Sequence, residues 1–223
     1  MLRGVIFDLD GVIIDSHPIH KAAWRRFLSS VGREVTDEEL DFILDGRKKE
    51  DILRFFLGDL SDEQIHQYGH QKETLFREEA LDINMVEGVT EFLELLQNAG
   101  IPMALATSGS HGRVHYILDR LRLKSCFRAV ITGDDVVKGK PDPAIFLAAA
   151  RHLDSPNADL LVIEDAVSGV KAAKEAHMKC LAIASNGRGQ VLRKAGADLV
   201  VPNFVGLSVE SLHKLGNGRN GHA

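Results

Sequence analysis

Short, continuous runs of apolar, largely β-branched residues recur along the chain. Such a run is expected of a strand that a parallel sheet buries on both faces. The runs cover residues 4–7, 102–106, 129–131, 160–163 and 180–184. Between them, apolar residues repeat at helical spacing over residues 89–96 and 114–121. Strands that alternate with helices predict an α/β fold, in which a parallel sheet carries helices on both faces.

The region from residue 16 to 81 interrupts this alternation, because it contains no buried-strand run. Thr36–Glu39 and Ser61–Gln64 match the capping box that opens helices, and the apolar residues around them repeat at helical spacing. We therefore predict a small all-α cap domain at 16–81, inserted into a core domain made of 1–15 and 82–215. Because residues 216–223 include three glycines and two asparagines, we expect them to form a disordered tail.

Composition limits the classes of partner. Hydrophobic residues make up 44% of the chain and charged residues 26%, which is ordinary for a soluble globular protein. The net charge of -5 argues against nucleic acid or an anionic membrane surface as the main partner. No signal peptide fits the N-terminus, and no apolar run approaches the ~20 residues of a membrane span. Cys126 and Cys180 indicate buried thiols of a reducing compartment. We expect a cytoplasmic monomer.

Polar residues follow four of the predicted strands. They are Asp8 and Asp10 after the first strand, Thr107 and Ser108 after the second, Lys140 on the loop after the third, and Glu164 and Asp165 after the fourth. Because the carboxyl ends of parallel strands meet at one edge of a sheet, we expect these side chains to converge. Two carboxylates ~4 Å apart repel by about 4 kcal/mol at an effective dielectric constant of ~20. A hard divalent cation such as Mg²⁺, together with Lys140, would offset that repulsion.

This combination of groups suits phosphoryl transfer. Asp8 is placed as an in-line nucleophile, because a carboxylate can form an aspartyl-phosphate. Asp10 would protonate the leaving oxygen and then take a proton from the attacking water. Thr107 and Ser108 would bind phosphoryl oxygens, helped by backbone N–H groups at a helix start, and Lys140 would stabilise the transferring charge. Taken singly, each motif also fits a solvated strand end, a helix cap or a turn lysine.

The four segments resemble, in order and context, the motifs of the haloacid-dehalogenase-like superfamily. The matching residues are Asp8-Leu9-Asp10-Gly11-Val12, Thr107-Ser108, Lys140-Pro141 and Ile163-Glu164-Asp165. The resemblance implies a Rossmann-like core, a helical cap of the first subclass and an aspartyl-phosphate intermediate. It also implies Mg²⁺ held by Asp8, the Asp10 carbonyl and Asp165, with Glu164 acting through water or in support.

The cap resembles that of β-phosphoglucomutases and related sugar-phosphate phosphatases. Ser16-His17-Pro18-Ile19-His20 with Trp24 is similar to their first cap helix, and Leu44-Asp45-Gly46 with Lys49 to their specificity loop. The resemblance marks His20, Gly46, Lys49 and Lys72 as candidate substrate contacts. The alternatives are a satisfied core histidine, a solvated charge run at Lys49, and a lysine at position 72 that extends to solvent along the helix surface.

Two departures from the mutases bear on the activity. Lys49 stands where they use an arginine, and Gly109-Ser110-His111 stands where they place Ser-Lys-Asn to hold a second phosphate. We therefore expect a magnesium-dependent phosphatase that acts on a small phosphorylated metabolite, a sugar phosphate. The cap would close over the substrate through hinges near residues 14–16 and 82–85. A phosphosugar mutase is the main alternative, and a non-catalytic protein that binds phosphorylated metabolites is a further one.

Overall fold

The structure, a computed structural model, describes residues 2–185 and 187–217. In this part of the chain six parallel strands form one sheet in the order β3-β2-β1-β4-β5-β6. The strands are β1 (Gly4–Phe7), β2 (Met103–Ala106), β3 (Ala129–Ile131), β4 (Leu160–Glu164), β5 (Lys179–Ile183) and β6 (Leu199–Val201). The first five lie within one residue of the predicted runs, so the predicted α/β fold is confirmed. The sequence analysis missed β6, a strand of three half-buried residues.

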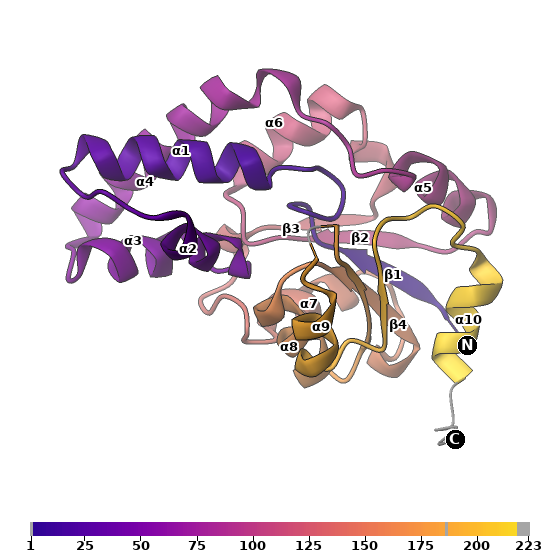
Figure 1. The fold of residues 1–223 in the computed structure, drawn as a ribbon. Helices are drawn as coiled ribbons and strands as arrows, with labels where there is room; N and C mark the ends of the chain where they lie inside the picture. The colour runs from indigo at the N-terminus through magenta and orange to yellow at the C-terminus, as the bar shows by residue number, and fades with distance from the viewer. Residues whose placement is uncertain (1, 186, 218–223) are drawn as a thin grey trace.

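Helices cover both faces of the sheet (Figure 1). Neighbouring residues of β1 point to opposite faces: Val5 and Phe7 belong to one apolar cluster and Ile6 to another. The first cluster includes residues of α5 (Val89–Asn98), α6 (His111–Leu121) and α10 (Val209–Asn217). The second includes residues of α7 (Ala144–Ala150), α8 (Val167–Glu175) and α9 (Gly189–Ala195). Short 3-10 segments connect some of these elements: η3 (Lys124–Cys126), η4 (Gly133–Asp135) and η5 (Asn157–Asp159).

The end of α10 corrects one prediction. The helix extends through Asn217, so the first two residues of the expected tail, 216–217, are helical. The rest of that tail, 218–223, lies outside the described residues.

Residues 16–81 contain helices and no strand, and each of them is among those described. The elements are α1 (His17–Ser30), α2 (Asp37–Leu40), η1 (Asp41–Asp45), α3 (Lys49–Leu57), α4 (Asp62–Glu79) and η2 (Ala80–Asp82). They enclose an apolar cluster of their own, which includes Trp24, Phe27 and Leu53. The two predicted capping boxes are present at the starts of α2 and α4. The division into core and cap, with its boundaries, stays a prediction.

The two connections between the helical segment and the sheet run side by side. Ile14 forms an isolated antiparallel bridge with Met85. Beside it, the Asp15 N–H donates to the Asn84 carbonyl at 2.9 Å and the Val86 N–H to the Ile13 carbonyl at 3.0 Å. These are the segments predicted as hinges, and their movement stays a prediction. Within the described ranges, no helix combines the length and apolar character needed to cross a membrane.

The sheet order determines where ligands can bind. After β1 the chain builds β2 and β3 on one side, and it then returns to build β4, β5 and β6 on the other. Phe7 is in register with Leu105 of β2 and with Ile163 of β4. The residues that follow these three strands therefore meet at the carboxyl edge, at the point where the strand order reverses.

Candidate active site

The predicted core residues meet at this carboxyl edge. Asp8 follows β1, Thr107 follows β2 and Asp165 follows β4, and all three line a cavity of about 70 Å³. Other predicted residues in its lining are Asp10, Ser108, His20, Gly46, Lys49 and Lys72. Core and helical segment thus share one cavity. Of the predicted site residues, only Lys140 and Glu164 lie outside this lining. Lys140 contacts both Asp8 and Glu164.

Lys140 is a buried cation between two carboxylates. Its Nζ donates to Asp8 Oδ1 at 2.7 Å and to Glu164 Oε1 at 2.6 Å. Burial disfavours the charged amine, but the two carboxylates outweigh it and raise the pKa of Lys140. Glu164 Oε2 accepts from the backbone N–H groups of Asp165 and Ala166, so both of its oxygens are engaged. Lys140 therefore stays charged and is held at Asp8.

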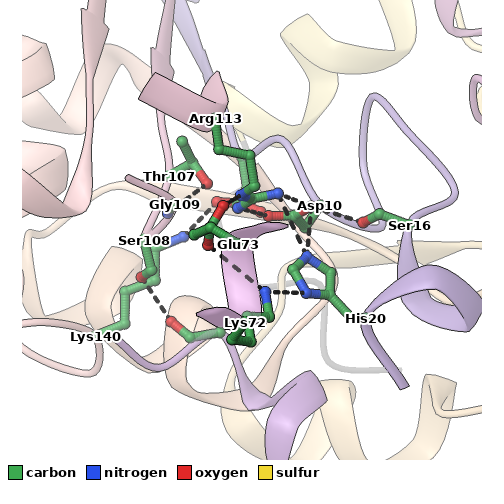
Figure 2. A network of polar contacts seen from close by, with 12 residues as sticks. Asp10, Ser16, His20, Lys72, Glu73, Thr107, Ser108, Gly109, Arg113 and Lys140 are labelled. Carbon is green, nitrogen blue, oxygen red and sulfur yellow. Dashed lines mark hydrogen bonds and ion pairs between the residues drawn. The ribbon is translucent and has the colours of Figure 1, made fainter. Parts of the chain in front are cut away.

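Asp10 is held from both sides of the cavity. Arg113 donates through Nη1 to Oδ1 at 2.9 Å and through Nη2 to Oδ2 at 2.6 Å, a bidentate pair. Ser16 Oγ donates to Oδ1 at 2.7 Å and His20 Nε2 lies 3.1 Å from it (Figure 2). Burial opposes ionisation, but Arg113 and His20 hold the pKa of Asp10 well below its ordinary value. Asp10 is therefore a carboxylate in this arrangement.

Arg113 is a site residue that the sequence analysis missed. It lies in the first turn of α6, where a lone arginine is usually solvated, yet its side chain is only 3% exposed. Gly109 gives it access to Asp10, because a Cβ at Gly109 would lie 2.3 Å from Arg113 Nη2. The one signal in the sequence was this glycine after Thr107-Ser108, which was interpreted only as a departure from the mutases.

His20 and Lys72 connect the helical segment to Asp10. Lys72 Nζ lies 3.2 Å from His20 Nδ1, so Nδ1 accepts and Nε2–H donates to Asp10. Burial lowers the pKa of His20 to about 4, and Lys72 adds to this effect. Burial also lowers the pKa of Lys72 to about 8, although the Glu73 carboxylate opposes it. Both residues thus lie within the site, and Lys72 is buried, not extended to solvent.

Comparison with known proteins shows to which family the chain belongs. The family model for haloacid dehalogenase-like hydrolases matches residues 5–183. This chain belongs to that family.

Its relatives include a phosphomutase and several phosphatases. The chain is 33% identical to β-phosphoglucomutase of Bacillus subtilis, over 96% of this chain and 95% of the relative. It is 34% identical to a phosphorylated carbohydrates phosphatase of Thermotoga maritima, over 90% and 94% of the two chains. Among solved structures, a family IA haloacid dehalogenase hydrolase from Entamoeba histolytica has a TM-score of 0.88 at 28% identity, covering 97% of this chain and 100% of the other. β-Phosphoglucomutase from Clostridium difficile has a TM-score of 0.87 at 26% identity, covering 97% and 98%.

In this haloacid dehalogenase-like enzyme, the loop around Gly46 rests directly on the core. Ser108 Oγ donates to the Gly46 carbonyl at 2.7 Å, so its hydroxyl contacts the loop of the helical segment in this arrangement. Gly46 has φ 69°, a left-handed conformation that glycine adopts at little cost. Lys48 Nζ donates to the Val136 carbonyl at 2.9 Å, and Ser168 Oγ donates to the Asp45 carbonyl. Lys49 lines the cavity beside this loop.

The residues around Asp165 are suited to an oxygen-binding cation. Asp165 Oδ2 is buried, and within the described chain it accepts no hydrogen bond of acceptable geometry, although His17 Nε2 lies 2.8 Å away. Gly11, at φ +72°, approaches so closely that a Cβ there would lie 2.2 Å from this oxygen. Burial raises the pKa of Asp165, and it raises the pKa of Asp8 to about 8 despite the contact with Lys140. His17 opposes this effect at Asp165 and Lys140 opposes it at Asp8, yet the pKa of each carboxyl stays raised, so a further cation would favour both ionised forms.

The other two predicted metal residues direct their carboxylates elsewhere. Asp10 binds Arg113, and Glu164 binds Lys140 and the backbone. Consistent with this, the described residues contain no group of three or more His, Cys, Asp or Glu side chains that is ready to hold a metal ion. A cation here would rely on the Asp8 and Asp165 side chains together with a backbone oxygen.

Proposed function

We propose that this enzyme is a magnesium-dependent phosphatase that hydrolyses a small phosphorylated metabolite, a sugar phosphate, through an aspartyl-phosphate on Asp8. The observation that carries the proposal is the position of Asp8 at the end of β1. Lys140 holds Oδ1, and no hydrogen bond from the described residues reaches Oδ2. Asp8 lines the cavity together with Asp10 and Asp165. A carboxylate oriented by a fixed cation is a suitable nucleophile.

The proposed reaction has two balanced steps. First, Asp8 Oδ2 forms a bond to phosphorus, the bond from phosphorus to the ester oxygen breaks, and Asp10 gives a proton to the leaving alcohol. Second, water attacks the same phosphorus while Asp10 takes its proton, and the bond from phosphorus to Asp8 breaks to release inorganic phosphate. Lys140 and the Thr107 hydroxyl would stabilise charge on the phosphoryl oxygens. The ionised Asp10 seen here suits the second step, and its contact with Arg113 must loosen for the first.

Mg²⁺ would be held by the carboxylates of Asp8 and Asp165 and by the main-chain carbonyl of Asp10. When bound, it supplies positive charge that offsets the phosphoryl oxygens and the two carboxylates. The raised pKa values of the Asp165 and Asp8 carboxyls, both caused first by burial, support this assignment. Glu164, with both oxygens engaged, would support Lys140 instead of binding the metal directly.

The substrate class rests on the relatives. They include a phosphorylated carbohydrates phosphatase, a hexitol phosphatase and a β-phosphoglucomutase. The cavity is small, about 70 Å³, and Asp10, His20 and Lys72 contact one another in its lining. Opening of the segment 16–81 would admit the substrate, and its return would exclude bulk water during the reaction.

A phosphosugar mutase is the second candidate, favoured by the 33% identity to β-phosphoglucomutase. A mutase must hold both ends of a bisphosphate. Gly109 has no side chain and His111 is exposed, so neither provides the second grip. We therefore favour hydrolysis.

The test is a screen of phosphorylated metabolites for released phosphate, with Mg²⁺ and with a chelator in its place. We expect release that requires Mg²⁺ and falls by on the order of 10⁴-fold in Asp8→Asn. Asp59→Asn, at an exposed cap position, serves as the matched control and should behave as the wild type. Incubation with β-glucose 1-phosphate and a trace of bisphosphate separates the candidates, since glucose 6-phosphate would indicate a mutase. Full activity in Asp8→Asn would refute the covalent mechanism.

A further inference from the structure

Three consecutive main-chain carbonyls of the helical segment, those of residues 44–46, are bound by side chains of the core. Arg188 Nη1 donates to the first of them at 3.2 Å. Ser168 Oγ donates to the second, and Ser108 Oγ donates to the third at 2.7 Å. We call these three donors the clasp. Because each carbonyl has its own donor, the loop at the end of η1 is fixed along its backbone and not through a single side chain.

The donors of the clasp come from three separate elements of the core. Ser108 lies just after β2, Ser168 lies in the first turn of α8, and Arg188 immediately precedes α9. Residues of α8 and α9 belong to the apolar cluster on one face of the sheet, so these donors are fixed relative to the sheet. The loop can therefore leave the core only when all three hydrogen bonds break.

The two residues that follow in the loop are also engaged. Lys48 Nζ donates to the Val136 carbonyl of the core at 2.9 Å, and its stem packs so closely that a Cβ at Gly139 would lie 2.4 Å from Lys48 Cγ. Arg47 Nε donates to Asp45 Oδ2 at 3.1 Å. Both basic side chains are thus held in place while the loop rests on the core, and they would be released when it leaves.

The loop forms one wall of the cavity in which the reaction would occur. Ile43, Leu44 and Gly46 line that cavity, whose volume is about 70 Å³. The clasp joins protein atoms directly to protein atoms, and a main-chain carbonyl accepts hydrogen bonds without needing a ligand or a charge. The contacts that hold this wall therefore do not depend on a substrate, and a small enclosed cavity can be entered or left only when the wall moves.

We infer that Arg188 and Ser168 are positioning residues that, with Ser108, hold the loop closed on the core in the free enzyme, so that opening of the loop is a gate. The inference rests on the proposed function only for what passes the gate, a phosphate ester inward and inorganic phosphate outward. Loss of one hydrogen bond of the clasp should raise the population of the open loop by about 2- to 10-fold.

The test is limited digestion with trypsin, which cleaves after the Arg47-Lys48-Lys49 run of the loop. The measured quantity is the rate of cleavage at these three positions, identified by mass spectrometry, because cleavage of a transiently open segment follows its population. The wild type without ligand should be cleaved slowly there, and inorganic phosphate with Mg²⁺ should change this rate little. Ser168→Ala and Arg188→Ala should each raise it about 2- to 10-fold, and the double variant by about the product of the two. Arg188→Lys keeps a donor and should stay closer to the wild type than Arg188→Ala.

Ser125→Ala and Arg193→Ala, at exposed positions of the core, are the matched controls and should keep the wild-type rate. The two clasp variants also control for each other. Burial raises the pKa of Asp165, and His17 and Arg188 oppose this, so Arg188→Ala also removes a charge that acts on Asp165. Faster cleavage in Arg188→Ala but not in Ser168→Ala would therefore come from that charge and would overturn the clasp.

Three further results would overturn the inference. An unchanged rate in the double variant would show that these contacts do not hold the loop. Wild-type cleavage as fast as in the double variant, slowed by phosphate with Mg²⁺, would show that the ligand closes the loop instead. An equal rise in cleavage at all sites of the chain would indicate general destabilisation. Because digestion requires no turnover, each of these results leaves the phosphatase function intact, and a metabolite screen without phosphate release would leave the clasp intact.

Discussion

Replacement of Lys140 by methionine tests the electrostatic centre of the site. Lys140 is 1% exposed at its side chain and holds Asp8 and Glu164 with hydrogen bonds of 2.7 and 2.6 Å. Methionine fills a similar volume without the charge. Glu164 would be left buried, with its backbone contacts but without a cation. Removal of one partner from a buried ion pair costs about 3–5 kcal/mol.

We therefore expect Lys140→Met to lower the free energy of unfolding by about 3–5 kcal/mol. Loss of the cation beside the nucleophile should also lower kcat by at least on the order of 10²-fold. Urea denaturation followed by circular dichroism gives the first quantity and phosphate release at saturating Mg²⁺ the second. Lys138→Met is the control, because Lys138 lies on the same loop with its side chain 78% exposed and should change little.

A second substitution separates charge from shape. Glu164→Gln in the Lys140→Met background removes the uncompensated carboxylate and should recover about 1–3 kcal/mol of the lost stability. If Lys140→Met unfolds like Lys138→Met, or if the double variant is no more stable than Lys140→Met alone, the ion pair does not have the energetic role assigned to it here.

Two glycine substitutions test the packing around the same groups. A Cβ at Gly169 would lie 1.7 Å from Glu164 Oε1, so Gly169→Ala should displace Glu164 and lower the free energy of unfolding by about 1–3 kcal/mol. Gly189→Ala is the control and should be nearly neutral, because the nearest atom to a Cβ at Gly189 is 3.4 Å away. Gly109→Ala should push Arg113 away from Asp10 and lower kcat about 10²-fold, as expected for a misplacement of about 1 Å. Gly112→Ala is its control, since the nearest atom there is 3.7 Å away. Wild-type kcat in Gly109→Ala would contradict the positioning role of Arg113.

The strands and the order of the motifs could be predicted from the sequence because parallel strands are buried on both faces. Each therefore appears as an apolar run that ends where polar residues begin, as at Phe7 and Asp8. Since all such strands end at the same edge, Asp8, Thr107 and Asp165 could be expected at that edge from the sequence. That they are neighbours there depends on the strand order β2-β1-β4. Strand β6 was missed although it is apolar and has as many residues as β3, which was predicted.

What the tertiary structure decided is which charged groups pair. Nothing local distinguishes Arg113 or Glu73 from solvated residues of an amphipathic helix. They become buried partners because α6 packs on the sheet and α4 packs over the cavity. Packing between elements also decides where Glu164 directs its carboxylate. It reaches Lys140 because Gly169 of α8 has no side chain, and a Cβ at Gly169 would lie 1.7 Å from Glu164 Oε1. Local sequence determines the type of each element, whereas side-chain pairing depends on distances between elements that only the folded chain sets.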